Sequence, residues 1–305
     1  MTGVAPPELP DNRIGALVRD VAAYFDAAAL AYGHGTDNAF DEAGWLVFAV
    51  ANLDHADAAK LNDRLLTDDR VAEIRQLAQR RASDRQPLAY LLGEAWFAGL
   101  KFRSDARALV PRSPIAELIV NGLAPWLALD ASVSALDIGT GGGCIAIALA
   151  AHHDMSVVAI DVDAAALALA RDNAREHGCD ERVEFMLSDV YASVPARRFD
   201  LIISNPPYVD AASMTDLPTE YRHEPAHGLR AGFSGLDVVD KILAGARDFL
   251  SDRGIVVVEV GDTQAALDAA YPDLAVTWLT MSDGASGIFL VTRYELDRWA
   301  AARGD

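Results

Sequence analysis

Apolar residues recur at intervals of three and four along the N-terminal part of the chain, a spacing typical of amphipathic helices. The predicted helices cover residues 14–32, 38–51 and 68–81. A glycine-rich turn at 33–37 separates the first two, and its Thr36 or Asp37 can cap the second helix. His34 in this turn is expected to face solvent. Because strand-like alternation is scarce here, we predict a helical bundle over residues 1–86.

Residues 87–120 connect this bundle to a region with a different pattern. Short apolar stretches at 95–102 and 108–110 predict a pair of strands. Pro114 suits the first turn of a helix that continues to Ile119. We therefore interpret this segment as a connector that contains a short strand pair.

Apolar strands and helices alternate from residue 133 onward. The predicted strands are 133–138, 156–160, 183–187, 199–204 and 254–260, and the predicted helices are 144–151, 164–177 and 236–250. This order is typical of an α/β fold with a parallel, doubly wound sheet. A closing pair of strands, 274–280 and 287–292 around Asp283-Gly284, is predicted to be antiparallel. We assign residues 121–305 to this second domain.

The composition fits a folded, enzyme-sized protein. The chain has 305 residues, of which 51% are hydrophobic, and no apolar run reaches the roughly 18 residues that a membrane span needs. Its 26 Lys and Arg against 45 Asp and Glu give a net charge of −19, which argues against a protein that wraps free nucleic acid. Cys144 and Cys179, in a chain without a signal-like leader, are expected to be reduced thiols of a cytoplasmic protein.

A glycine-rich segment lies between the first predicted strand and the helix that follows it. It reads Asp137, Ile138, Gly139, Thr140, Gly141, Gly142 and Gly143. Glycines allow the backbone to approach a ligand closely, and the following helix offers free N–H groups. The segment therefore indicates a nucleotide-like ligand. The alternative is a tight strand-to-helix turn, although four glycines exceed what such a turn requires.

Carboxylates follow the next two predicted strands. Asp161 lies 22 positions after Gly139, where a carboxylate can accept both hydrogen bonds of a ribose diol. It could instead cap the following helix, a role to which Asp163 has an equal claim. Asp189 is well placed for an adenine amino group, or it is one of the polar residues that commonly end a strand.

The decisive motif is Asn205-Pro206-Pro207-Tyr208, which directly follows the predicted strand 199–204. The two prolines remove two backbone donors and stiffen the segment, so that the Asn205 side chain and a proline carbonyl can face one point. Two acceptors that face one point suit an NH₂ group. The Tyr208 ring can pack over a planar amide or base beside it.

Together these residues resemble a class I S-adenosylmethionine-dependent methyltransferase that acts on an amino or amide nitrogen. The resemblance covers nearly the whole chain, because connector segments are similar to those of the protein-glutamine N5-methyltransferases. These are Pro87-Leu88-Ala89-Tyr90-Leu91-Leu92-Gly93, Phe97-Ala98-Gly99-Leu100 and Val110-Pro111-Arg112. Three further segments resemble the ribosomal-protein, PrmB-type branch: Gly35-Thr36-Asp37-Asn38-Ala39, Arg112-Ser113-Pro114-Ile115-Ala116-Glu117-Leu118 and Glu220-Tyr221-Arg222-His223-Glu224-Pro225. The release-factor branch typically has Pro-Glu-Thr after its Pro-Arg pair and remains the near alternative.

The resemblance implies a Rossmann-like, seven-stranded, mostly parallel sheet, S-adenosylmethionine as methyl donor and no metal. It implies that Asp137 and the loop from Gly139 to Gly143 lie at the methionine end of this donor and that Asp161 holds the ribose. Asp189 with Val190 would border the adenine. The release-factor branch often has an aromatic residue where Val190 stands, so the stacking partner of the adenine stays open.

The same resemblance assigns the substrate side of the site. Asn205 and the Pro206 carbonyl would hold a glutamine amide, with Asn205 also beside the methyl donor, while Pro207 and Tyr208 would complete the contact. The substrate would be one glutamine of large-subunit ribosomal protein three, recognised through the N-terminal helical domain. A nucleic-acid adenine or guanine amino methyltransferase is a less favoured alternative, because the same motif can grip the NH₂ of a flipped base.

Two further features have a functional and a structural interpretation. His223 lies 18 positions after Asn205, in a loop where it would contact substrate or anchor the loop. The stretch 75–112 carries eight Lys and Arg against three Asp and Glu. It is either a solvated face or a contact for ribosomal RNA.

Overall fold

The computed structural model describes residues 5–54, 58–282, 284 and 286–304. The chain divides into two compact units. The helical unit comprises residues up to Ala95 together with Pro218–His223, and the sheet unit comprises Trp96–Leu217 and Glu224–Asp305. The first unit contains the whole expected helical domain, residues 1–86, together with the first part of the expected connector and the segment Pro218–His223.

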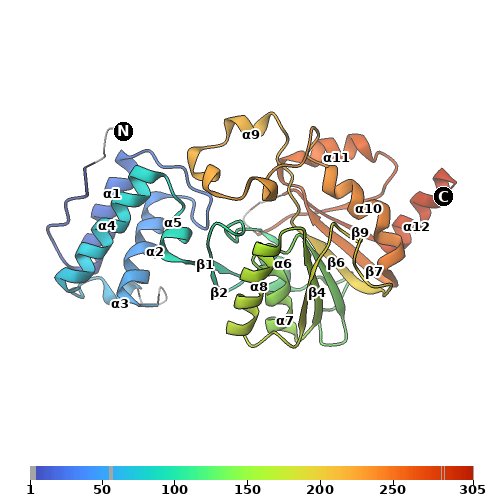
Figure 1. The fold of residues 1–305 in the computed structure, drawn as a ribbon, viewed down its shortest axis with the longest axis horizontal. Helices are drawn as coiled ribbons and strands as arrows, with labels where there is room; N and C mark the ends of the chain where they lie inside the picture. The colour runs from blue at the N-terminus through green and yellow to red at the C-terminus, as the bar shows by residue number, and fades with distance from the viewer. Residues whose placement is uncertain (1–4, 55–57, 283, 285, 305) are drawn as a thin grey trace. The chain divides into compact units, whose positions relative to one another are not determined.

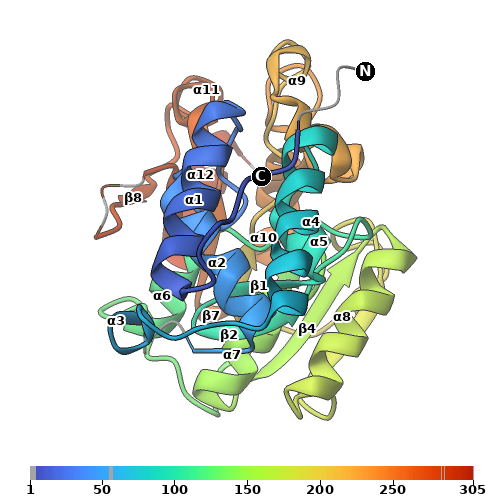
Figure 2. The same cartoon turned by 90° about the vertical axis from the view of Figure 1, so that its left-hand side faces the viewer.

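The helical unit is built from three longer helices and shorter pieces. They are α1 (Ile14–Ala27), α2 (Ala39–Ala51), α3 (Ala58–Leu61), α4 (Asp68–Asp84), α5 (Leu88–Leu92) and the 3₁₀ helix η2 (Thr219–His223). Figure 2 shows α1, α2 and α4 side by side, and their inward faces bury Leu17, Leu46 and Ile74 completely. The predicted helix 14–32 was too long, because the chain leaves the helix after Ala27 and Ala29 takes a left-handed φ of +48°.

The cap of α2 differs from both predicted candidates. Asn38 lies at the N-cap position, and its side-chain oxygen accepts a hydrogen bond of 2.9 Å from the backbone N–H of Asp41. Thr36 instead donates its hydroxyl to the carboxylate of Glu42. His34 is also not solvent-facing: it is buried, and its ring centroid lies 4.4 Å from that of Tyr221. The turn is therefore covered by the segment that contains η2.

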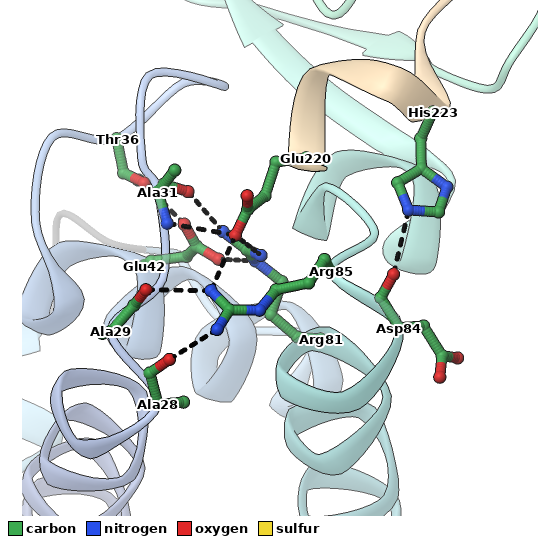
Figure 3. A network of polar contacts seen from close by, with 10 residues as sticks. All are labelled: Ala28, Ala29, Ala31, Thr36, Glu42, Arg81, Asp84, Arg85, Glu220 and His223. Carbon is green, nitrogen blue, oxygen red and sulfur yellow. Dashed lines mark hydrogen bonds and ion pairs between the residues drawn. The ribbon is translucent and has the colours of Figure 1, made fainter. Parts of the chain in front are cut away.

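A buried network of charged groups explains why this segment belongs to the helical unit (Figure 3). The guanidinium of Arg81 in α4 donates to Glu42 in α2 at 2.5 Å. Glu220 in η2 supplies a second carboxylate, which lies 3.4 Å from Arg81 and 3.2 Å from Arg85. It also accepts the backbone N–H of Ala31 at 3.0 Å. Two guanidiniums and two carboxylates thus balance each other, and Arg81, Glu42 and Glu220 are buried while Arg85 is 33% exposed.

The sheet unit contains a seven-stranded sheet in the order β5-β4-β3-β6-β7-β9-β8. Its strands are β3 (Ser134–Ile138), β4 (Ser156–Asp161), β5 (Val183–Leu187), β6 (Phe199–Ser204), β7 (Leu250–Glu259), β8 (Thr277–Leu279) and β9 (Ile288–Thr292). The neighbouring pairs from β5 to β7 are parallel, whereas β9 is antiparallel to both β7 and β8. The predicted doubly wound, mostly parallel sheet is confirmed. Asp283 in the predicted closing turn lies outside the described residues.

Helices cover both faces of this sheet (Figure 1). The helices of the sheet unit are α6 (Ile115–Asn121), α7 (Cys144–His153), α8 (Ala164–Glu176), α9 (Ser213–Asp216), α10 (Asp237–Phe249), α11 (Gln264–Ala270) and α12 (Arg293–Arg303), with the 3₁₀ turns η3 (Ala226–Gly228) and η4 (Gly261–Thr263). Side chains of α6 and α7 pack with one face of the central strands, and side chains of α10, α11 and α12 pack with the other. Alternate residues of each strand thus enter different cores.

The predicted strand pair of the connector is partly wrong. Two strands form, β1 (Glu94–Phe97) and β2 (Leu100–Arg103), and they pair with each other across a tight turn at Ala98 and Gly99. Both turn residues have positive φ, as a two-residue hairpin of this hand requires. The stretch 108–110 forms no strand, because the backbone N–H of Val110 donates to the Glu224 carboxylate instead of to a neighbouring strand. Within the described residues, no helix is both long and apolar enough to cross a membrane.

Candidate active site

The strand order changes direction between β3 and β6. The strands after β3, namely β4 and β5, lie on one side of this pair, and β7 lies on the other side, next to β6. Ligands of doubly wound sheets bind beyond the carboxyl ends of the strands at such a switch point. The glycine loop follows β3 and the Asn-Pro-Pro-Tyr motif follows β6, so the fold brings the two strongest sequence signals to one edge. The hydroxyl of Ser204 donates to the Ile138 carbonyl at 2.7 Å and fixes the two strand ends together.

The glycine loop has the backbone conformation that its sequence predicts. Gly139, Gly141 and Gly143 have φ angles of +71°, +55° and +85°. The N–H groups of Gly139 and Thr140 both donate to the Ile160 carbonyl at 2.9 Å. A Cβ placed on Gly139 would meet no described atom within 4 Å, so the loop is open on that side. This side is therefore accessible to a ligand.

Asp137 ends β3 with a buried carboxylate that is only half satisfied. Its Oδ2 accepts the Thr140 hydroxyl at 2.6 Å and the Ala146 N–H at 3.2 Å. Its Oδ1 has no hydrogen-bond partner among the described residues. Burial raises the pKa of this carboxyl to about 7. A buried acceptor without a donor is costly, so this oxygen suits a ligand that brings a cation or an N–H group.

Asp161 ends β4 and holds the glycine loop from the other side. Its Oδ2 accepts the Gly141 N–H at 2.8 Å, and its Oδ1 accepts the Asp163 N–H at 2.9 Å. Burial raises the pKa of Asp161. The cap of α8 is Asp163, which accepts the Ala165 N–H at 2.7 Å, so the alternative assignment of Asp161 as helix cap is wrong. Each oxygen of Asp161 retains a lone pair for a ligand hydroxyl.

The residues after β5 differ from expectation in one respect. Asp189 lies at the surface and pairs with Lys241 at 2.8 Å. Val190 is 6% exposed, packs within the core and has a φ of +48°. Its side chain therefore offers no face to a ligand, and only its backbone can border one. The exposed apolar side chains at this edge are Val162 at 60% and Leu187 at 53%.

The Asn-Pro-Pro-Tyr segment presents polar groups that the protein itself does not use. Neither the Asn205 side chain nor the Pro206 carbonyl hydrogen-bonds to any other described residue. Pro206 is buried and Asn205 is half-buried. The Tyr208 hydroxyl donates to Glu259 at the end of β7, with an oxygen–oxygen distance of 3.0 Å. The segment therefore has a fixed tyrosine and two acceptors available to a ligand.

Comparison with known proteins agrees with this geometry. The family descriptions "Methyltransferase small domain" and "PrmC N-terminal domain" match residues 120–232 and 26–93. A protein of Burkholderia pseudomallei named ribosomal protein uL3 glutamine methyltransferase is 43% identical over 296 residues, which cover 94% of this chain and 96% of that protein. A protein of the same name from Xanthomonas campestris pv. campestris is 44% identical over 299 residues, covering 97% and 96%. The chain belongs to the uL3 glutamine methyltransferase family. The ribosomal-protein branch predicted from the sequence is thereby confirmed.

The glycine loop of this uL3 methyltransferase family member has a support that the sequence analysis missed. Asn173 of α8 is buried, and its amide donates to the Gly142 carbonyl at 2.9 Å. Its oxygen accepts the Arg103 N–H at 2.8 Å. One side chain therefore joins the loop, α8 and the β1–β2 hairpin. The sequence does hold a signal for this role, because Asn173 is a polar residue on the otherwise apolar face of the helix between Ala166 and Ala174.

Two adjacent residues after the Asn-Pro-Pro-Tyr motif are held in place, Glu224 by a guanidinium and His223 by a backbone carbonyl. Glu224 accepts two hydrogen bonds from the Arg112 guanidinium, at 2.6 and 2.9 Å, within the sheet unit. In the helical unit, a ring nitrogen of His223 lies 2.9 Å from the Asp84 carbonyl oxygen. This contact supports the interpretation of His223 as a loop anchor.

The basic stretch 75–112 carries less free charge than its sequence suggests. Five of its eight cationic side chains lie against carboxylates, namely Arg81, Arg85, Arg103, Arg107 and Arg112. The stretch also divides between the two units at Ala95. These ion pairs favour a structural role for most of its charge. Among the described residues, no group of three or more His, Cys, Asp or Glu is arranged to hold a metal ion.

Proposed function

We propose that this protein transfers a methyl group from S-adenosylmethionine to the side-chain amide nitrogen, N5, of a glutamine in ribosomal protein uL3. The observation that carries the proposal is the pair of unused acceptors, the Asn205 side-chain oxygen and the Pro206 carbonyl, at the switch point of a methyltransferase sheet. A primary amide has two N–H donors, which two acceptors can satisfy together. Relatives of this chain are named ribosomal protein uL3 glutamine methyltransferase. We place the reaction in the cytoplasm, in keeping with two free cysteines.

The residues around the glycine loop fit S-adenosylmethionine. The unpaired Asp137 Oδ1 suits the ammonium group of a methionine moiety, and the open side of Gly139 leaves room for it. Asp161 retains acceptor capacity for ribose hydroxyls. We assign the packing against the adenine to Val162 and Leu187, which are exposed at the ends of neighbouring strands, with Asp189 available for its amino group. When bound, S-adenosylmethionine supplies a methyl group on a positively charged sulfur.

Positioning and polarisation must supply the rate, because the lone pair of an amide nitrogen is delocalised into its carbonyl. Asn205 and Pro206 accept both N–H bonds, which increases the electron density on nitrogen and orients it. Such alignment can contribute about 7 to 11 kcal/mol to lowering the barrier. Tyr208 packs against the planar amide and prevents rotation out of this arrangement. The departing proton can pass to water after the new bond has formed, so no side-chain base is required.

Incubation with labelled S-adenosylmethionine tests the proposal. Separated uL3, a peptide chain release factor and ribosomal RNA are offered in parallel, and labelled protein is mapped by mass spectrometry. We expect one methyl group on one glutamine of uL3 and none on the other substrates. Labelling of the release factor alone would place the protein in the other branch, and labelling of RNA alone would show that the motif holds a base.

A further inference from the structure

Glu259 at the end of β7 is a buried carboxylate to which the proposed mechanism gives no task. Its side chain is 5% exposed. Its Oε1 accepts the Tyr208 hydroxyl at 3.0 Å, and its Oε2 accepts the Ser113 hydroxyl at 2.5 Å. Each oxygen thus serves one hydroxyl, and the two hydroxyls come from the substrate motif and from the connector. A carboxylate in such a place is costly to bury unless its contacts are needed.

The backbone around Tyr208 is shaped to seat its ring. A Cβ on Gly261, two residues after Glu259, would lie 2.7 Å from a ring carbon of Tyr208. A Cβ on Gly235 would lie 2.6 Å from the Tyr208 carbonyl oxygen. Any side chain at either glycine would collide with the tyrosine. The ring is therefore held at its hydroxyl by Glu259 and seated against Gly261.

The second contact of Glu259 is fixed in its turn. Ser113 follows Arg112, whose guanidinium makes two hydrogen bonds with the buried Glu224. The Ser113 hydroxyl also accepts the Ile115 N–H at 3.2 Å, at the start of α6. The connector therefore presents Ser113 from a firmly held turn. Glu259 is a junction between this turn and the motif.

We infer that Glu259 is a positioning residue for methyl transfer, which fixes the Tyr208 ring where the glutamine amide must pack. This inference rests on the proposed function. Glu259 contacts Tyr208 and Ser113 and acts on the reaction only through them. A tyrosine needed only for packing would not require a carboxylate, because a phenylalanine in an apolar seat would satisfy the same space without a buried charge.

Substitutions at Glu259 and Tyr208 separate the hydroxyl contact from general packing. In Glu259→Ala the ring loses its anchor, and misplacement of this kind is expected to lower kcat about 10- to 100-fold. In Glu259→Gln one acceptor oxygen remains, so at least part of this loss should be recovered. Tyr208→Phe should lower kcat to a similar extent. Both changes remove the same hydrogen bond, between the Tyr208 hydroxyl and Glu259. The kcat of the double variant Glu259→Ala/Tyr208→Phe should therefore be little lower than that of either single variant.

Controls distinguish positioning from a loss of folding. The unfolding midpoint and the dissociation constant of S-adenosylmethionine should change little in Glu259→Gln. Gly261→Ala should lower kcat as well, because its Cβ displaces the ring. Gly178→Ala is the matched control, since Gly178 also has positive φ, +61° against +50°, but a Cβ there meets no described atom within 4 Å.

The position of the Tyr208 ring can also be measured in the absence of substrate. Carbon-13 labelled tyrosine gives a ring resonance for Tyr208, which is assigned by its loss in Tyr208→Phe. We expect this resonance to shift or broaden in Glu259→Ala and to stay unchanged in Gly178→Ala. An unchanged resonance, or losses of kcat that multiply in the double variant, would overturn the inference while leaving the proposed function intact. A displaced ring in a protein that does not methylate uL3 would overturn the proposed function and would show only that Glu259 anchors the Tyr208 ring.

Discussion

Arg81 carries a full positive charge at 1% exposure, and the helical unit depends on how that charge is balanced. Replacing Arg81 with methionine keeps the length of the side chain and removes the charge. Glu42, which is 2% exposed, would then keep only the Thr36 hydroxyl as a hydrogen-bond donor among the described residues. Glu220 would keep Arg85 and the Ala31 N–H. The main cost is therefore an uncompensated charge at Glu42.

The size of this effect follows from measurements on buried ion pairs. Removing one partner of such a pair typically costs about 3 to 5 kcal/mol, because the other charge stays buried without compensation. Arg80→Met on the same helix is the control, since Arg80 is exposed and a change there should stay within about 0.5 kcal/mol. The double variant Arg81→Met/Glu42→Leu removes both charges and should recover most of the loss.

Native-state hydrogen exchange measures this effect in the helical unit alone. The free energy of opening is followed at protected amides of α2 and α4, for wild type and the three variants. We expect a loss of about 3 to 5 kcal/mol in Arg81→Met and recovery in the double variant. If Arg81→Met matched Arg80→Met, or if the double variant were less stable than Arg81→Met, the buried network would not stabilise the unit.

Three further outcomes follow from the site. Burial raises the pKa of Asp137 from 3.8 to about 7, so between these pH values the folded protein binds more protons than the unfolded chain, and the free energy of unfolding should fall as the pH rises. Asp137→Asn should reduce this dependence of the unfolding free energy on pH, measured by urea titration, and an unchanged dependence would refute the assignment. Asn173→Leu removes the hydrogen bond to the Gly142 carbonyl and should weaken S-adenosylmethionine binding about tenfold, measured by calorimetry, with kcat nearly unchanged. An unchanged affinity would show that the glycine loop does not need the Asn173 hydrogen bond. Binding of isolated ribosomal RNA should depend only weakly on salt, whereas a slope corresponding to several phosphate contacts would show that the stretch 75–112 binds RNA.

The strands and the position of the site were accessible from sequence because they depend on local pattern. The strand 199–204 was correct to the residue, and the strand before the glycine loop ends at Ile138 as predicted. A run of apolar residues predicts the strand. A following motif that the turn itself does not require indicates a ligand-binding site. The alternation of strand and helix then predicts a parallel, doubly wound sheet.

The contacts that were not predicted join residues far apart in sequence. Glu220 lies 139 positions after Arg81, and nothing in a polar loop indicates that its carboxylate is buried against the helices of the first 95 residues. Glu259 resembles an ordinary polar strand end until its contacts with Tyr208 and Ser113 are known. The sequence also does not indicate that Val190 has a left-handed backbone and packs its side chain into the core. Such features require the tertiary structure.

Asn205→Ala is the most direct test of the central claim that Asn205 and Pro206 hold the amide of the substrate. Methyl transfer to uL3 and the heat of S-adenosylmethionine binding are measured on the same preparation. The account predicts that turnover is abolished while the affinity for S-adenosylmethionine stays within a few-fold of wild type. Retained turnover, or an equal loss of S-adenosylmethionine binding, would contradict it.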